Sequence, residues 1–317
     1  MNQEHFERRY RDEWISFDNT LDRLDRKREL SSLEDFPHVY RRLSKQLALA
    51  RDRQYSVHLV NELNALVLRA HRYLYKSKKV TLYGIMRVFT HDFPQAVRRD
   101  ARLFWLSTLL FYGPLLAMIW AIHINPELAY SIIPPEQAAS YEQMYNSPTS
   151  EDRTAADDVM MFGYYIQHNV GIAFRTFGSG LLFGVGAIIT VLFNGVAIGA
   201  VAGYIVHLGF GDTFFRFVCG HASFELTAIV LAGMAGMKLG FALLIPGGKT
   251  RRQKLTETAH ALLPVVYGMA VMLFIAAFIE AFWSPRTLTA GIKYGVSGFF
   301  WLLLTVYFLF SGRTHEN

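Results

Sequence analysis

Apolar side chains recur every three or four residues along the first quarter of the chain, in three successive stripes. The first stripe runs through Phe6, Trp14 and Leu21, and two further stripes cover residues 40–50 and 55–74. This spacing places the apolar side chains on one face of a helix. Three amphipathic helices of this length can bury their stripes against one another, so residues 1–79 are predicted to form a helical bundle.

Long apolar segments replace these amphipathic stripes in residues 103–317. A helix needs about 20 consecutive apolar residues to cross a bilayer, and several segments reach that length. They lie near residues 103–124, 177–207, 214–246, 259–283 and 293–311. The pattern therefore predicts an all-α fold, namely a polytopic helical membrane protein that carries an N-terminal helical bundle.

Charged residues on either side of the first apolar segment indicate its orientation. Residues 80–102 combine an apolar stripe, which suits a helix in the membrane interface, with the basic juxtamembrane residues Arg98, Arg99 and Arg102. Residues 125–158 hold seven acidic residues and one arginine. Because basic residues favour the cytoplasmic side of a membrane, we expect the N-terminal bundle in the cytoplasm and residues 125–158 in an extracytoplasmic loop.

The middle of the chain leaves the path through the membrane open. Residues 159–176 are aromatic but polar, which favours an interfacial or re-entrant helix. The segments 177–207 and 214–246 exceed one bilayer thickness, so they are either tilted or broken, and Asn194 marks the expected break. If each of the segments 103–124, 177–207 and 214–246 crosses the membrane once, the basic loop 249–254 lies on the extracytoplasmic side. This placement goes against the tendency of basic loops to lie in the cytoplasm. A re-entrant hairpin over 214–246, or dominance of the early charges, would resolve this, and the side of the C-terminus depends on which holds.

Small residues spaced four apart recur within the apolar segments. Such spacing puts glycines on one helix face and lets two helix backbones approach closely. The glycines concerned are Gly180, Gly184, Gly195, Gly199, Gly203, Gly236 and Gly240, with Gly291 and Gly295 in the last segment. Two interpretations are open, which are packing within one chain and formation of a homodimer.

Four polar residues inside the apolar segments are candidates for an intramembrane polar site: Asn194, His221, Glu225 and Lys238. His221 and Glu225 lie four residues apart, so on a helix they share a face and can hydrogen-bond. Ionisable groups in hydrocarbon need a partner. Lys238 can extend its ammonium to the membrane interface or pair with Glu225 or Glu280, and its distance from both ends of its segment favours pairing. The His221–Glu225 pair can be a structural lock, a site for an ion, proton or polar ligand, or part of a metal centre, which would need a third protein ligand.

Several classes of function lack their sequence patterns. The chain has no phosphate-binding loop, no nucleophile elbow and no zinc-protease motif, so we expect no enzyme activity, no catalytic residue, no metal and no cofactor. A basic half next to anionic lipid accounts for the positive charge, and no nucleic-acid-binding module is visible. The lone Cys219 allows no disulfide within one chain.

A series of short motifs, spread over nearly the whole chain, resembles the stage II sporulation protein M family of bacterial inner-membrane proteins. The motifs are Val39-Tyr40-Arg41-Arg42-Leu43, Leu63-Asn64, Phe183-Gly184-Val185-Gly186, Asn194-Gly195, Gly220-His221 with Glu225, and Ile245-Pro246-Gly247. The resemblance implies a multi-pass, all-helical protein of the bacterial inner membrane with a cytoplasmic N-terminal helical domain. It supplies no catalytic residues.

The resemblance also frames two hypotheses of function. The name-giving member works with a cell-wall hydrolase and a second envelope protein, which implies a non-enzymatic scaffold or assembly component of a cell-envelope complex. The alternative is a transporter or channel with a polar site around Asn194, His221 and Glu225. The expected partners are the lipid bilayer, other envelope-complex membrane proteins and a second copy of the chain, and not nucleic acid.

Overall fold

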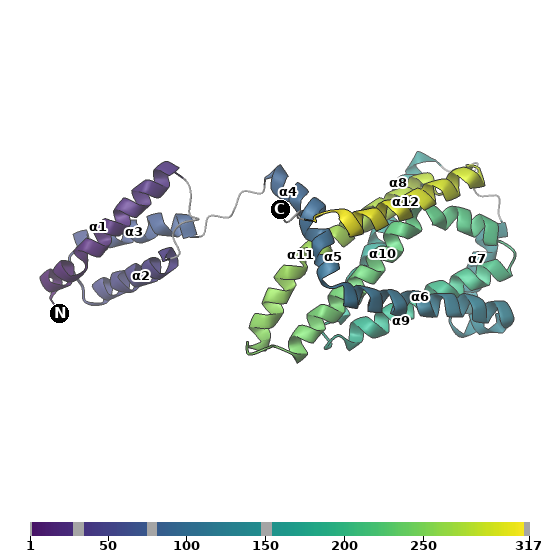
Figure 1. Cartoon of the computed structure of the whole chain (residues 1–317), viewed down its shortest axis with the longest axis horizontal. Helices are drawn as coiled ribbons and strands as arrows, with labels where there is room; N and C mark the ends of the chain where they lie inside the picture. The colour runs from purple at the N-terminus through teal and green to yellow at the C-terminus, as the bar shows by residue number, and fades with distance from the viewer. Residues whose placement is uncertain (1, 28–34, 75–80, 147–153, 314–317) are drawn as a thin grey trace. The chain divides into compact units, whose positions relative to one another are not determined.

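The computed structural model describes residues 2–27, 35–74, 81–146 and 154–313, which form helices and no strand. The prediction of an all-α, polytopic helical membrane fold is confirmed. The chain divides into two compact units, Met1–Val80 and Thr81–Asn317, which Figure 1 colours from purple to blue and from blue to yellow. The predicted domain boundary at 79–80 and residues 147–153 of the predicted acidic loop lie outside the described residues.

The first unit is a bundle of α1 (Gln3–Lys27), α2 (Phe36–Asp52) and α3 (Val57–Leu74). The apolar stripes of the sequence meet in one core. This core includes Phe6, Trp14, Phe17, Leu21, Leu43, Leu59 and Leu63. Burying such side chains is the main favourable term for a bundle of this size. The indole of Trp14 also donates a hydrogen bond of 2.7 Å to Gln46 on α2, so its polar atom is satisfied inside the core.

One arginine joins α3 to the polar side of α1. The guanidinium of Arg69 lies 2.5 Å from Asp18, 2.6 Å from Asp22 and 2.9 Å from Asp25. Tyr73 donates a hydrogen bond to Asp25, and this bond together with Arg69 lowers the pKa of Asp25. The three carboxylates are about half exposed, so each pair contributes only modestly to stability.

The second unit, called the membrane unit below, runs from α4 to α12. Its elements are α4 (Leu82–Arg87), the π-helix η1 (Val88–Asp92), α5 (Phe93–Arg99), α6 (Ala101–Ile124), the 3-10 helix η2 (Pro126–Ser131), α7 (Pro135–Asn146), α8 (Ala155–Ser179), α9 (Val185–His207), α10 (Gly211–Leu244), α11 (Arg251–Phe278), the π-helix η3 (Ile279–Trp283) and α12 (Ala290–Phe310). Among the described residues, five helices are long and apolar enough to cross a membrane, namely α6, α9, α10, α11 with η3, and α12.

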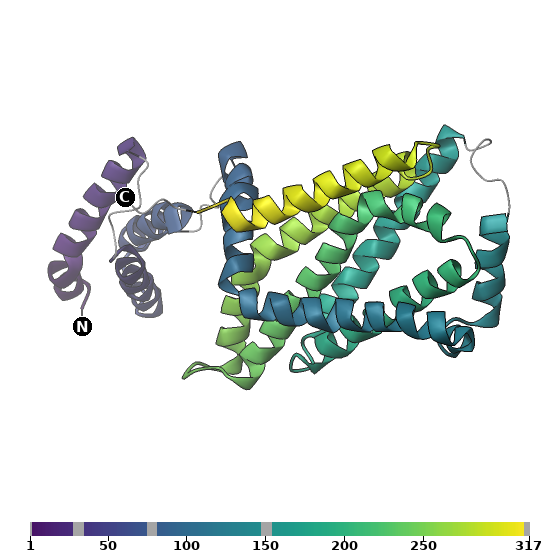
Figure 2. The same ribbon diagram turned by 45° about the vertical axis from the view of Figure 1, so that its right-hand side comes forward.

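Helix α10 is the centre of the membrane unit. It packs against α6, α8, α9, α11 and α12, and both views show it running between α12 on one side and the pair of α6 and α9 on the other (Figure 1, Figure 2). In its most apolar stretch 72% of the residues are buried, against 17% in α6 and 11% in α12. The outer faces of α6 and α12 are therefore the surfaces left for lipid or a partner.

The chain breaks at a different place from the one predicted. Helix α9 continues through Asn194, and α10 is one unbroken helix of 34 residues, so the expected break at Asn194 and the re-entrant hairpin over 214–246 are both wrong. The break lies at residues 180–184, where Phe183 has φ 54° and Gly184 has φ 83°. Glycine adopts this left-handed conformation without steric cost, which lets the chain reverse between α8 and α9.

Contacts at one end of the membrane unit bring together three helix termini. Lys238, near the end of α10, pairs with Asp100, which directly precedes α6. Arg98 on α5 donates to the carbonyl oxygen of Phe308 near the end of α12, at 2.8 Å. The loop between α10 and α11 leaves from the same end of α10 and leads into the basic residues 249–254. We call this the basic end.

The opposite ends of these helices meet α7 and the start of α8. Arg286, between η3 and α12, pairs with Asp158 in the first turn of α8. The hydroxyl of Tyr204, near the end of α9, donates to Glu142 on α7 at 2.6 Å. Because α7 belongs to the predicted acidic loop, we call this the acidic end.

Helix α8 runs from the acidic end to the basic end, a course that favours a crossing of the membrane over the interfacial or re-entrant helix expected for residues 159–176. Asp158 lies at its acidic end, and Gly180, directly after it, touches the backbone of Gly236 on α10. Its 25 residues correspond to about 37 Å of helix, enough for a hydrocarbon core of about 30 Å. Two of its polar side chains, Asn169 and Thr176, bond to other helices, whereas Gln167 and His168 are exposed on its surface.

The small-residue faces found in the sequence pack within the chain. A Cβ at Gly240 would overlap the backbone of Gly184 and Gly180, and a Cβ at Gly195 or Gly199 would overlap carbonyl oxygens of α6. These glycines allow α8, α9 and α10, and then α9 and α6, to touch through their backbones. On α12, by contrast, a Cβ at Gly291 or Gly295 would meet no atom within 4 Å.

We predict that Gly240→Ala destabilises the membrane unit, by about 1–3 kcal/mol, because the new methyl group overlaps backbone that cannot move aside. Gly291→Ala is the matched control. It should leave stability unchanged or raise it by up to about 1 kcal/mol, since alanine favours a helix and the site is open. Thermal unfolding of both purified variants in detergent measures the difference. Equal melting temperatures would contradict the backbone contact.

The end-to-end course of α8 predicts that Ser140 on α7 and Lys249 lie on opposite sides of the membrane. Single cysteines introduced as Ser140→Cys and Lys249→Cys, in a Cys219→Ser background, should react with an impermeant maleimide from opposite sides of sealed membranes. Both positions are exposed, so accessibility does not limit either reaction. Labelling of both from the same side would mean that α8 does not cross.

Candidate functional site

Three metal-ligating or proton-binding side chains gather between α10 and η3. One atom each of His221, Glu225 and Glu280 lies within 4.8 Å of the others, and no other such group of three occurs in the described residues. We call these three residues the intramembrane cluster. The His221 and Glu225 side chains are 5% and 16% exposed, so the cluster is almost enclosed by protein.

The local structure explains how the cluster forms. His221 and Glu225 are one helical turn apart on α10, and the Nε2 atom of His221 lies 3.8 Å from Oε2 of Glu225. Glu280 is brought in by the π-helix η3, a widened turn that re-aims side chains and is frequent at functional sites. A Cβ at Gly220 would overlap the ring of Trp283, so Gly220 allows η3 to lie directly on α10.

Two neighbouring side chains hold the cluster in place. The Nδ1 atom of His221 hydrogen-bonds with the Ser284 hydroxyl at 3.1 Å. Asn169 on α8, which is 3% exposed, donates to Oε2 of Glu280 at 3.3 Å. Three stretches of chain that are distant in sequence therefore meet here: α8, α10, and η3 with the residue that follows it.

The charge of the cluster is not balanced by a basic side chain. In the part of the chain that the structure describes, neither Glu225 nor Glu280 forms an ion pair with lysine or arginine. The buried Lys293 lies beside the cluster, but its ammonium donates to the carbonyl oxygen of Ser284, at 2.7 Å. Two carboxylates and one imidazole therefore share a nearly enclosed volume. Such a group can hold a proton between carboxylates or bind a cation.

The other two predicted site residues lie elsewhere. Lys238 pairs with Asp100, rather than with Glu225 or Glu280 as expected. It lies 13 positions after Glu225 on α10, which is about 20 Å along a helix. Asn194 donates to the hydroxyl of Thr176 on α8 at 3.1 Å. The four predicted residues therefore form three separate polar contacts, and His221 and Glu225 alone stay together.

Sequence reasoning missed most of the partners. Glu280 was considered from the sequence as a partner of Lys238, and no local pattern linked Ser284 or Asn169 to the cluster. Asp100 lies among the basic juxtamembrane residues, so the sequence did not indicate that it pairs with Lys238. An acidic residue inside an otherwise apolar segment, four positions before a serine, is the signal that could have drawn attention to Glu280.

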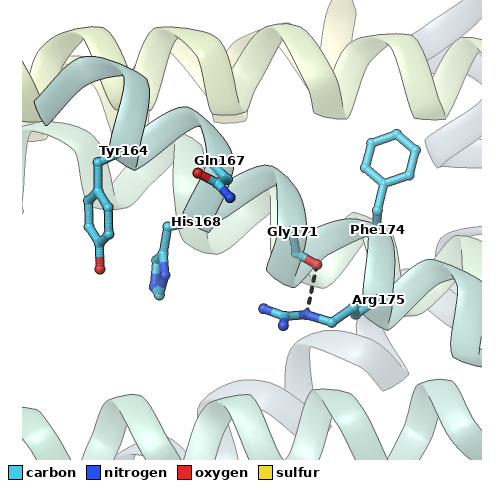
Figure 3. A pocket seen from close by; sticks show the side chains of 6 residues that line it. All are labelled: Tyr164, Gln167, His168, Gly171, Phe174 and Arg175. Carbon is cyan, nitrogen blue, oxygen red and sulfur yellow. Dashed lines mark hydrogen bonds between the residues drawn. The ribbon is translucent and has the colours of Figure 1, made fainter. Parts of the chain in front are cut away.

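A pocket of about 620 Å³ lies along a different face of α8. Its lining residues are Tyr164, Gln167, His168, Gly171, Phe174 and Arg175. Figure 3 shows the rings of Tyr164 and His168 side by side and the Arg175 side chain running back toward Gly171. The two rings stack at 5.7 Å, and Arg175 Nε donates to the Gly171 carbonyl at 3.0 Å. The pocket is therefore lined by three polar side chains of α8, namely Gln167, His168 and Arg175.

Comparison with known proteins assigns the family. A family model described as Stage II sporulation protein M matches residues 107–285, which is more than half of the chain and includes the whole intramembrane cluster. The chain belongs to the stage II sporulation protein M family. The predicted resemblance is thereby confirmed, and the region of the match shows that the family domain comprises α6 to η3.

Two further matches extend this picture of the family member. A domain of unknown function, DUF8413, matches residues 4–76, which contain α1 to α3. An uncharacterized protein, MJ0793, from Methanocaldococcus jannaschii is 24% identical over 130 residues, which are 40% of this chain and 73% of that protein. No solved structure matches the chain.

Proposed function

We propose that this family member is a non-enzymatic scaffold or assembly component of a cell-envelope complex. The observation that carries the proposal is the use of the polar side chains of the membrane unit as ties between its helices. Asn194 joins α9 to α8, Lys238 joins α10 to the start of α6, and Ser107 joins α6 to the backbone of α10 at 2.7 Å. Such ties produce a rigid platform and leave little polar surface for a transport pathway.

The two units give a scaffold of this kind separate surfaces for partners. The N-terminal bundle has its own core, and it presents charged residues and a few exposed apolar side chains, including Val57 and Leu68. On the membrane unit, α7 lies at the acidic end. Within the bilayer, the poorly buried α6 and α12 offer faces to lipid or to membrane-embedded partners.

We further propose that the protein is a multi-pass protein of the bacterial inner membrane with its basic end and N-terminal bundle in the cytoplasm. If α8 crosses, the residues before α6 and the loop 249–254 lie on one side, and α7 lies on the other. All the basic segments then lie inside, as the positive-inside tendency requires, and the conflict in the sequence disappears. If α11 and α12 then cross once each, the residues after α12 lie on the cytoplasmic side.

Homodimerisation stays a proposal, and α12 is now the helix through which two copies would pair. The predicted packing glycines are occupied by contacts within the chain, so they are not available to a second copy. They are Gly180, Gly184, Gly195, Gly199, Gly203, Gly236 and Gly240. The open face of α12 that contains Gly291 and Gly295 remains, and small residues on an exposed membrane helix permit close helix pairing.

A transporter or channel is the second candidate, and the intramembrane cluster is the observation that favours it. Glu225 and Glu280 lie in a nearly enclosed place without a basic partner among the described residues. Carboxylates placed in this way within a membrane commonly mark the path of an ion or a proton.

Two measurements separate these proposals. The scaffold proposal predicts that a photoreactive amino acid at the exposed Leu68 yields a discrete cross-linked product in native membranes, and that Glu225→Gln leaves this product unchanged. It also predicts that proteoliposomes show no proton or divalent-cation flux above that of protein-free liposomes. Flux that disappears with Glu225→Gln but persists with the exposed control Glu257→Gln would establish the transporter instead. Absence of both product and flux would reject both.

A further inference from the structure

We propose that His221, Glu225 and Glu280 bind one divalent transition-metal ion, which links α10 to η3 within the membrane unit. The chain supplies one imidazole nitrogen and two carboxylates, all with a ligand atom within 4.8 Å of the others. The sequence alone places only His221 and Glu225 side by side, and the third ligand that a metal centre needs, Glu280, arrives through η3.

The spacing of these atoms suits a metal ion after a small adjustment. A zinc ion with ligand bonds of about 2.0–2.2 Å and tetrahedral geometry holds its ligand atoms roughly 3.4 Å apart. His221 Nε2 and Glu225 Oε2 are 3.8 Å apart. Side-chain rotations that shift these two atoms by a few tenths of an ångström would bring both into the coordination sphere. The ligand atom of Glu280, which lies within 4.8 Å of the other two, would move closer by up to about 1.4 Å.

The hydrogen bonds around the cluster have the arrangement found behind metal ligands. A ligating histidine commonly donates its second ring N–H to a neighbouring oxygen, which fixes the tautomer and orients the free nitrogen. Here Nδ1 of His221 lies 3.1 Å from the Ser284 hydroxyl, and this leaves Nε2 facing Glu225. Asn169 donates to one oxygen of Glu280, which fixes that carboxylate and leaves its other oxygen for the ion.

Charge balance favours a dication over a monovalent cation. With a metal ion bound, Glu225 and Glu280 would both be deprotonated and would together carry a charge of −2. Neither forms an ion pair with a lysine or arginine among the described residues. A divalent ion neutralises both carboxylates at once, and buried charges are tolerated only when they are compensated in this way. The buried ammonium of Lys293 donates to the carbonyl oxygen of Ser284, the residue whose hydroxyl contacts His221.

The ligand types narrow the class of ion. Imidazole with carboxylates suits zinc, iron(II) and manganese(II), whereas magnesium and calcium prefer sets made only of oxygen ligands. Three protein ligands leave at least one coordination position for water or another small ligand. We assign no reaction to the site, and the proposal does not depend on the scaffold function, because the metal is measured on the purified chain without any partner.

The test uses the full chain, purified without a histidine tag, stripped with a chelator and reconstituted into nanodiscs. Zinc is then added, and bound metal is measured by mass spectrometry of the elements and by calorimetry. We expect about one zinc ion per chain. His221→Asn, Glu225→Gln and Glu280→Gln should each weaken binding at least tenfold, and Ser284→Ala should weaken it by about 10–100-fold, as loss of a hydrogen-bond partner behind a ligand does.

Matched controls lie on the exposed part of α11. His260→Asn and Glu257→Gln change the same residue types at exposed positions and should leave zinc binding as in the unchanged chain. Size-exclusion chromatography identifies any variant that fails to fold. For that case, X-ray absorption of the unchanged chain loaded with zinc gives an independent test, with one imidazole and otherwise oxygen ligands expected. No saturable zinc binding, equal binding by all variants, or more than one imidazole on the ion would overturn the proposal.

Discussion

The membrane unit is governed by the fact that hydrocarbon does not solvate polar groups, so each polar side chain placed between its helices needs a partner on another helix. The structure meets this requirement repeatedly. Lys238 pairs with Asp100, Asn194 with Thr176, and Asn169 with Glu280. Because each contact joins different helices, the polar residues fix which helices are neighbours and at what height they meet.

Close approach of the helix backbones makes these short polar contacts possible. Gly180, Gly184 and Gly240 let the turn between α8 and α9 lie against α10 without intervening side chains. A larger residue there would push α8 and α9 outward and separate the polar partners as well. The glycines and the polar ties therefore act together. The glycines let the helix backbones come close together, and the polar contacts select one arrangement of the closely packed helices.

The intramembrane cluster is the place where this pattern changes. The polar contacts of Lys238, Asn194 and Ser107 each join complementary partners on two helices. Glu225 and Glu280 instead lie together beside His221, and neither forms an ion pair with a basic residue among the described residues. A widened helical turn, η3, is needed to bring Glu280 there. A structural lock alone would not require two carboxylates, and this excess of negative charge is the reason for assigning the site to a dication.

Sequence reasoning predicted the elements of the fold better than their connections. Periodicity identified the three stripes of the N-terminal bundle, and length and apolarity identified the segments that became α6, α9, α10, α11 and α12. It did not predict that α8 runs the length of the membrane unit, because partners of its polar residues, such as Glu280, are more than 100 positions away. It also misplaced the break at Asn194, since a polar residue satisfied by another helix and one that marks a break look identical in sequence.

For the same reason, the sequence predicted that His221 and Glu225 lie together but did not predict that Glu280 joins them. His221 and Glu225 are one helical turn apart, so their spacing in the sequence predicts that their side chains lie close together. Glu280 is 55 positions after Glu225, and its approach depends on η3 and on the contact between Gly220 and Trp283. No local pattern encodes such a meeting of two helices, which is decided by tertiary packing.

Polar groups of the membrane unit are stabilised by partners on other helices. A double-mutant cycle at Lys238 and Asp100 measures the free energy of one such pair directly. Unfolding free energies are compared for Lys238→Met, Asp100→Asn and the double variant in detergent. We predict a coupling energy of about 1–3 kcal/mol, against about 0.5 kcal/mol or less for the exposed pair of Lys249 and Glu257. Additive effects at Lys238 and Asp100, with no more coupling than at the exposed pair, would contradict the account.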